Sequence, residues 1–172
     1  MVNNAQIIKK IYFPRLIIPV SSILVALFDF LMAFILFVPL LFLYRQPVAW
    51  IAVVCWPFAL AISLVATLGP GCLLAALNVK YRDFRYVIPF LVQILFFLTP
   101  VIYPVSLIKQ PVLQYLLVMS PMYAAVEIFR YPLSGVELNI TFLTVSLSSG
   151  IVLLLGGLVY FKRTEDFFAD LA

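Results

Sequence analysis

The stretch at residues 46–79, QPVAWIAVVCWPFALAISLVATLGPGCLLAALNV, contains no charged side chain. A helix needs about 20 apolar residues to cross a bilayer, so this run is long enough to span a membrane. In a soluble domain, a helix of this length would carry polar side chains on the face that meets water. The stretch therefore predicts a transmembrane helix and sets the class of the whole chain.

The rest of the chain has the composition of a multi-pass membrane protein. Of its 172 residues, 66% are hydrophobic and only 10% are charged. Further apolar runs at 16–44, 86–108 and 138–161 are also long enough to cross a bilayer. A β-barrel would show short alternating strands instead. We therefore expect an all-α polytopic fold with four transmembrane helices.

Basic residues set the expected orientation, because loops rich in Lys and Arg stay in the cytoplasm. With both termini inside, most of the eleven basic residues are cytoplasmic. This topology explains the net charge of +4 without a nucleic-acid partner. The inside set is Lys9, Lys10, Arg15, Lys80, Arg82, Arg85, Lys162 and Arg163, and the outside set is Arg45, Lys109 and Arg130.

The apolar segment 111–133 is too short and too broken for a further crossing. Ser120 is placed as a helix N-cap, Pro121 at the first helical position and Gly135 beyond the helix end. We expect two short helices that are re-entrant in the outer leaflet or lie on its interface. An ordinary outer loop is the alternative.

Two proline-containing segments have specific expected effects on neighbouring helices. Pro100 and Pro104 are expected to bend the third span as it reaches the outer surface. The sequence Gly69-Pro70-Gly71 predicts a kink and a close helix contact in the second span. The two cysteines and the absence of histidine give no ligand set for a metal.

Between the second and third spans lies NVKYRDFRYVIPF, residues 78–90, with charged side chains at Lys80, Arg82, Asp83 and Arg85. Topology alone accounts for a basic inner loop. The residues themselves resemble the permease subunit of ABC-2 type exporters. The same resemblance extends to IIKKIYFPRLIIP near the start, SPMYAAVEIFRYPL, and the ending GLVYFKRTEDFFADLA. The nearest branch exports O-antigen, capsular polysaccharide or teichoic acid.

Members of that family usually have six spans after an amphipathic interface helix. The resemblance implies that 1–172 is a single ABC-2 type transmembrane domain, the C-terminal two-thirds of a six-span permease. It implies export of a lipid-linked polysaccharide across the bacterial inner membrane. The alternatives are a truncated or split permease fragment without transport of its own, or an exporter of teichoic acid.

The resemblance also implies that the chain is not an enzyme and that a separate ATP-binding subunit drives it. The sequence agrees, because it lacks a G-x-x-x-x-G-K-[ST] phosphate loop. No cofactor is expected, and a membrane-embedded glycosyltransferase fits poorly because no loop carries paired carboxylates. The implied partners are the ATPase, a second permease copy, the glycan and membrane lipids.

The implied coupling elements are the segment 1–15 and the loop 78–85, and the implied outer gate is 109–137. Charged residues of the coupling elements can form charge-assisted hydrogen bonds with the ATPase. Lys10, Arg15, Arg82 or Arg85 can instead hold the lipid pyrophosphate. The coupling candidates are Lys9, Lys10, Tyr12, Phe13, Arg15, Tyr81, Arg82, Asp83 and Arg85.

The candidates for the substrate path are Asp29, Tyr103 and Tyr123. Asp29 is the one charge inside a predicted span, where a carboxylate costs about 2.5–3.5 kcal/mol. It either lines the path or forms a structural hydrogen bond to a neighbouring helix. The two tyrosines flank the expected outer exit.

Overall fold

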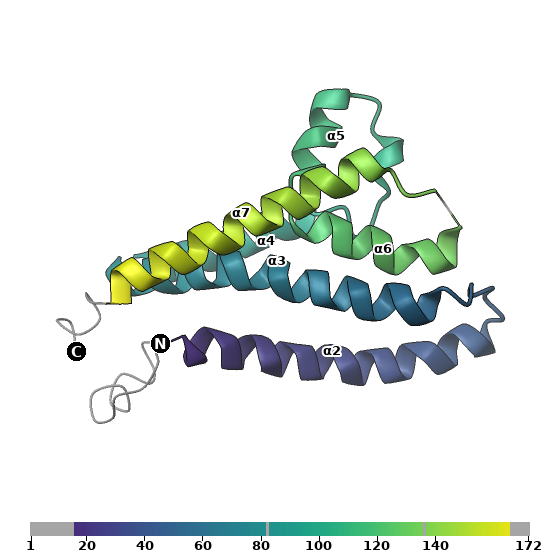
Figure 1. Cartoon of the computed structure of the whole chain (residues 1–172), viewed down its shortest axis with the longest axis horizontal. Helices are drawn as coiled ribbons and strands as arrows, with labels where there is room; N and C mark the ends of the chain where they lie inside the picture. Colours follow the sequence, from purple (N-terminus) through teal and green to yellow (C-terminus); the bar gives the residue numbers. More distant parts are fainter. Residues whose placement is uncertain (1–15, 82, 136, 166–172) are drawn as a thin grey trace.

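The computed structural model describes residues 16–81, 83–135 and 137–165, and this part of the chain contains helices and no strands. The three longest helices run along the long axis of the molecule, while α5 projects to one side (Figure 1). The expected all-α fold is confirmed for these residues. The helices are α2 (Ile17–Leu43), α3 (Ala52–Lys80), α4 (Phe84–Leu98), the 3-10 helix η2 (Val105–Leu107), α5 (Pro111–Val118), α6 (Met122–Ser134) and α7 (Ile140–Glu165).

Three helices, α2, α3 and α7, are long and apolar enough to cross a membrane. They correspond to the first, second and fourth expected spans. The α5–α6 pair passes the same test only if its two helices, bent by 95°, are taken together. The described residues thus offer three candidate crossings, or up to four with the bent pair, and the expected set of four spans stays a prediction.

The expected third span, 86–108, is helical only as far as Leu98. α4 has 15 residues, and the chain then becomes extended at Thr99. Because the ring of a proline disfavours the helical conformation of the preceding residue, Pro100 ends this helix where we expected a bend. The chain continues as a loop that contains η2 before α5 begins.

The central contact of the fold is the crossing of α3 and α7, the most extensive helix pair. Gly69 lies so close to α7 that a Cβ atom there would be 2.6 Å from the carbonyl carbon of Leu153. A Cβ at Gly157 would in turn overlap the backbone of Gly69. The two glycines therefore let the backbones touch, and the close contact predicted for the Gly69 segment is confirmed. The predicted kink stays a prediction.

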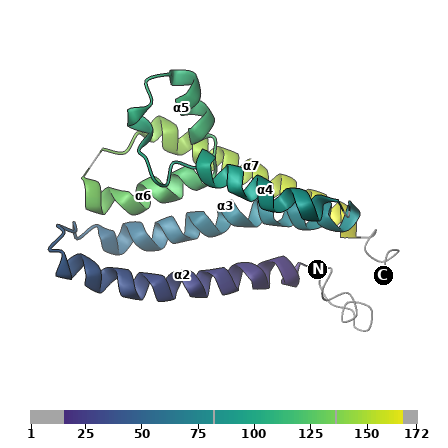
Figure 2. The same cartoon turned by 180° about the vertical axis from the view of Figure 1, so that it is seen from behind.

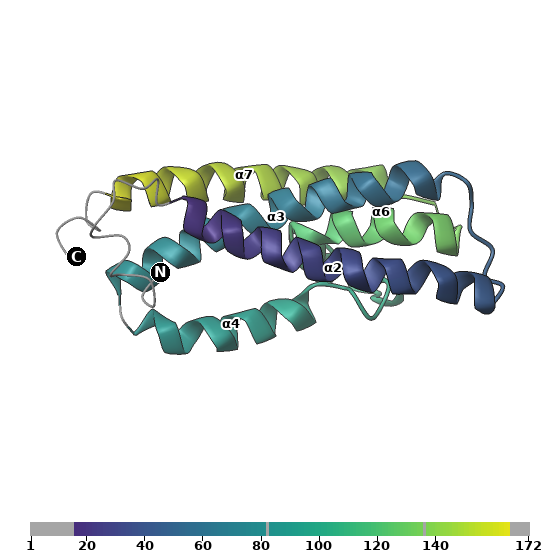
Figure 3. The same ribbon diagram turned by 90° about the horizontal axis from the view of Figure 1, so that it is seen from below.

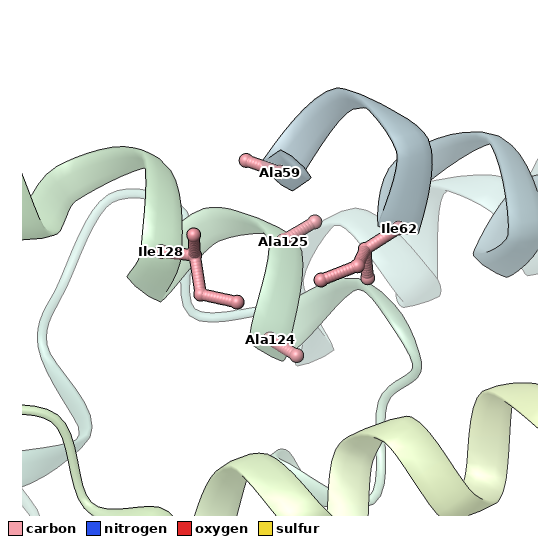
Figure 4. Packing of buried hydrophobic residues seen from close by; sticks show 5 residues of the cluster. All are labelled: Ala59, Ile62, Ala124, Ala125 and Ile128. Carbon is pink, nitrogen blue, oxygen red and sulfur yellow. The ribbon is translucent and has the colours of Figure 1, made fainter. Parts of the chain in front are cut away.

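α6 packs against the other half of α3. Ala59 and Ile62 of α3 meet Ala124, Ala125 and Ile128 of α6 in a buried apolar cluster (Figure 4). The alanines allow the two helices to approach closely, as small residues do at helix contacts in membranes. α6 is thus fixed to the same helix that carries Gly69.

α2 is attached to this core mainly through aromatic rings. The ring centroid of Trp56 on α3 lies 5.1 Å from that of Phe34 on α2 and 5.9 Å from that of Phe129 on α6. The Trp56 indole N–H also donates a hydrogen bond to the Phe129 carbonyl at 3.3 Å. Most of the remaining surface of α2 is exposed, as expected for a helix in contact with lipid or a further subunit.

The segment 111–133 forms two short helices, as the sequence predicted. α6 begins at Met122 with Pro121 at the N-cap position, so the predicted start was one residue early and Ser120 is not the cap. Gly135 ends the helix in the left-handed conformation at φ 63°, which confirms its predicted place. We call the residues between the two helices, Met119, Ser120 and Pro121, the elbow.

Serines of α7 form hydrogen bonds with backbone groups of the elbow and of the first turn of α6. The Ser146 hydroxyl donates to the Ser120 carbonyl at 2.8 Å and accepts from the Ala124 N–H at 3.0 Å. The Ser149 hydroxyl donates to the Met119 carbonyl at 2.7 Å. Because unpaired backbone groups are costly in a membrane, these bonds stabilise the sharp bend.

Replacement of Gly69 by alanine tests the α3–α7 contact. Gly69→Ala places a methyl group against the Leu153 and Leu154 backbone, so α3 and α7 must separate. Such overpacking costs about 1–3 kcal/mol, and we expect a lower midpoint of thermal unfolding in detergent. The matched control is Gly156→Ala on α7, which points into open space. Equal unfolding midpoints for the two variants would contradict the contact.

Removal of the Ser146 hydroxyl tests the elbow. Ser146→Ala leaves the Ala124 N–H and the Ser120 carbonyl without this partner, at a cost of about 1–3 kcal/mol. We expect faster amide hydrogen exchange at the start of α6, measured by mass spectrometry. Ser148→Ala is the control, because the Ser148 hydroxyl bonds only its own helix, at Val145. Unchanged exchange in Ser146→Ala would show that the elbow does not depend on this serine.

Candidate functional site

Exposed charged side chains gather where α3 ends and α4 begins. Tyr81 follows the last residue of α3 and is 49% exposed, while Asp83 and Arg85 at the start of α4 are both exposed. The Lys80 ammonium lies 5.5 Å from the centroid of the Tyr81 ring. The ring centroids of Tyr81 and Phe84 are 6.1 Å apart. The structure therefore brings three of the predicted coupling residues together on an accessible turn.

The end of α7 lies beside this turn and adds further positive charge. Phe161 of α7 is buried against Cys72 and Ala76 of α3, which places the exposed Lys162 and Arg163 at the same end of the molecule. The beginning of α2 lies at this end too (Figures 1 and 2). We call this region, formed by Lys80, Tyr81, Asp83, Arg85, Lys162 and Arg163, the charged end.

The remaining coupling candidates lie outside the described residues. They are Lys9, Lys10, Tyr12, Phe13, Arg15 and Arg82.

Asp29 lies near the middle of α2 and is exposed. Its carboxylate makes no hydrogen bond or ion pair with residues in the described ranges. Neighbouring side chains on the same helix, Phe28 and Phe30, are exposed and apolar. Within this part of the chain, therefore, no partner of the kind expected for a structural hydrogen bond is found.

The two tyrosines predicted near the outer exit are placed differently. Tyr103 is partly buried, and its hydroxyl donates to the Phe97 carbonyl at 3.0 Å, capping the end of α4. Tyr123 is only 5% exposed and packs with Val105 and Val118 in an apolar cluster. In this structure Tyr123 is a packing residue of the bent pair, with little surface available to a ligand.

A set of polar contacts that the sequence did not point to joins the segment after α4 to the bent pair. The Thr99 and Ser120 hydroxyl oxygens are 3.1 Å apart in a buried hydrogen bond. The Arg130 guanidinium donates to the Val101 carbonyl, and it lies 3.8 Å from the Glu127 carboxylate. The sequence held a weak indication of the Glu127–Arg130 pair, since these two charged residues are one helical turn apart within an apolar segment.

The described residues offer surfaces for binding rather than a constellation for chemistry. No three His, Cys, Asp or Glu side chains among them lie together as a metal site would require. The polar groups near the elbow are paired with one another, whereas those of the charged end are exposed. The charged end is therefore the better candidate for contact with another molecule.

Comparison with known proteins identifies the family. The family model described as ABC-2 type transporter matches residues 6–133. The chain is 25% identical, over 99% of its length, to the O-antigen export system permease protein RfbA of Klebsiella pneumoniae. It is 30% identical, over 74% of its length, to the protein of the same name from Myxococcus xanthus.

The chain spans 65% of the length of the Klebsiella relative and 49% of that from Myxococcus. The family match covers most of the chain and includes α2, α3, α4, α5 and most of α6. Its apolar helices of spanning length and its similarity to permeases both indicate a location in the membrane. The chain belongs to the ABC-2 type transporter family and is a multi-pass protein of the bacterial inner membrane.

Proposed function

We propose that the chain is the permease part of an ATP-driven exporter that moves a lipid-linked polysaccharide, O-antigen, across the inner membrane. The observation that carries this proposal is the similarity to O-antigen export permeases over 99% of the chain. The fold supports it, since apolar helices of spanning length make up most of the described residues. In this role the chain itself performs no chemistry.

The proposed topology has four crossings and both termini in the cytoplasm. α2, α3 and α7 cross the bilayer, and α4 with the segment that follows it makes the third crossing. The start of α2 and the end of α7 lie at one end of the molecule, which agrees with an even number of crossings (Figure 1). The charged end then faces the cytoplasm, as the positive-inside rule requires.

Energy is supplied by a separate ATP-binding subunit that contacts the charged end. Asp83 and Arg85 are exposed and available for charge-assisted hydrogen bonds with the ATPase. The neighbouring rings of Tyr81 and Phe84 offer it an aromatic contact. The proposed docking surface consists of residues 78–85, from the last residues of α3 to the first residues of α4, together with the segment 1–15. The basic side chains are also suited to a lipid pyrophosphate at the inner leaflet.

The bent pair and the loop before it, 109–137, form the proposed outer gate. The pair turns by 95° at the elbow, a bend that fits a re-entrant segment as well as a broken span, and in the proposed gate it is re-entrant. Its backbone groups at the elbow are satisfied by Ser146 and Ser149, which is the condition for an irregular backbone at membrane depth.

A second copy of the chain completes the proposed path. α2 and α4 leave broad apolar faces uncovered, and Asp29 lies exposed on α2. Because a mid-span carboxylate facing lipid costs about 2.5–3.5 kcal/mol, Asp29 requires a further helix or a water-filled path beside it. A homodimer supplies both.

Asp83→Ala tests the docking surface. If Asp83 bonds the ATPase, its loss removes a charge-assisted contact worth about 2–5 kcal/mol when desolvated, and export should fall at least tenfold. We expect the variant to remain in the membrane at the wild-type amount. The measurement is the surface O-antigen of cells that rely on this chain, with membrane content determined by immunoblot.

Arg45→Gln is the control, because it removes an exposed charge that lies outside both the charged end and the proposed gate. Wild-type export by Asp83→Ala would refute the role of this residue. Co-purification tests the proposed function more broadly: the chain should bring an ATPase subunit with it from detergent extracts. Recovery of the permease without any ATPase would argue against it.

Cysteine labelling tests the proposed orientation. In a chain whose Cys55 and Cys72 are replaced by alanine, single cysteines are placed at Tyr81 and at Lys109, both exposed positions. An impermeant maleimide should label Lys109→Cys in intact spheroplasts, whereas it should label Tyr81→Cys only after the membrane is opened. The reverse pattern would overturn the placement of the charged end in the cytoplasm.

A further inference from the structure

α4 is held at its two ends and makes few contacts between them. None of its residues is buried, and Tyr86, Phe90 and Phe97 are 82%, 65% and 64% exposed. Seen from below, the helix runs apart from the other long helices over most of its length (Figure 3). At about 1.5 Å per residue, its 15 residues span roughly 22 Å.

The first attachment is the turn at the charged end. Lys80 ends α3 and Phe84 begins α4, so only three residues separate the helices. The Phe84 N–H donates to the Tyr81 carbonyl at 3.1 Å, which tightens the turn. A displacement of this turn must therefore move the start of α4.

The second attachment lies just beyond the other end of α4, where burial increases sharply. Thr99 is 9% exposed and Pro100 is fully buried, in contrast to the exposed helix before them. The Thr99 hydroxyl bonds the Ser120 hydroxyl at the elbow. The Tyr103 hydroxyl bonds the Phe97 carbonyl, which fixes the loop to the last turn of the helix.

A separate contact ties the same loop to α6. The Arg130 guanidinium donates to the Val101 carbonyl, and the Glu127 carboxylate beside it favours this position of the charge. Arg130 lies eight residues beyond the start of α6, about 12 Å along the helix from the elbow. The loop after α4 is therefore fixed at two separated points of the bent pair, which defines an orientation as well as a position.

We propose that Thr99, Ser120 and Arg130 form a joint through which α4 acts as a strut between the charged end and the bent pair. The helix is continuous from Phe84 to Leu98, with Pro89 in its interior, and makes few contacts with the rest of the chain. A movement imposed at Tyr81–Asp83 therefore reaches the elbow and α6 through this joint. The mechanical part stands on the contacts alone, while the transmission of ATP-driven movement rests on the proposed function.

The test breaks the joint in the full-length chain and measures where α4 lies. The joint variant is Thr99→Val, Ser120→Ala and Arg130→Gln together. The matched control, Thr144→Val, Ser148→Ala and Arg45→Gln, removes the same groups at exposed positions, where the two hydroxyls bond only their own helix. Both are made in the chain whose two native cysteines are replaced by alanine and are reconstituted in nanodiscs.

Spin labels at exposed positions report three distances by pulsed electron paramagnetic resonance. Phe96–Val152 reports the outer end of α4 relative to α7, Tyr86–Val159 reports its inner end, and Val112–Val152 reports α5. In the joint variant we expect the Phe96–Val152 distribution to widen about twofold, because α4 loses its attachment there. The other two distributions, and all three in the control, should keep their wild-type width.

An unchanged Phe96–Val152 distribution would overturn the proposal, since the joint would then not hold α4. Equal widening of the Val112–Val152 distribution would also overturn it, because the three residues would then support the whole region. No ATPase takes part in this measurement. A failure to co-purify an ATPase would therefore contradict the proposed function without affecting the conclusion that the joint holds α4.

Discussion

The structure depends on the backbone contact between Gly69 of α3 and Gly157 of α7. In lipid, apolar side chains gain little by leaving the solvent, so helices associate through close van der Waals contact. A Cβ at either glycine would meet backbone atoms, which cannot move aside as a flexible side chain can. The other elements build on this pair, because α6 packs on α3 and the elbow is hydrogen-bonded to α7.

The elbow shows what a fixed helix pair makes possible. A chain that bends by 95° leaves N–H and C=O groups without helical partners. Ser146 and Ser149 lie three residues apart on α7 and therefore share a face, from which both reach the elbow. Gly150 lies on the next position and brings α7 against Pro121, since a Cβ there would be 3.4 Å from the proline side chain. The same part of α7 therefore sets the position of the elbow and supplies its hydrogen bonds.

Much of this fold could be predicted from the sequence, because the strongest signals are local. Long apolar runs, interrupted only by Asp29 in α2, predicted α2, α3 and α7, and Gly135 marked the end of α6. The end of α4 was missed although a local rule existed: Thr99 precedes a proline and leaves the helix. The contacts of Ser120 with Thr99 and Ser146 could not be predicted, since the partners are 21 and 26 residues away and the packing of α7 selects them.

The two sets of polar residues differ in how they are used, and this difference bears on function. Near the elbow, hydroxyls and the Arg130 guanidinium bond other parts of the chain, so they serve the fold. At the charged end, Asp83, Arg85 and Lys162 are exposed. Charged groups of a membrane protein that serve no internal contact remain available to water, to lipid headgroups or to another protein. The turn that presents Asp83 and Arg85 is also the point where α4 is joined to α3. In the proposed function, a molecule bound at this turn acts on α4, and the Thr99–Ser120 hydrogen bond ties the segment just beyond the other end of α4 to the elbow.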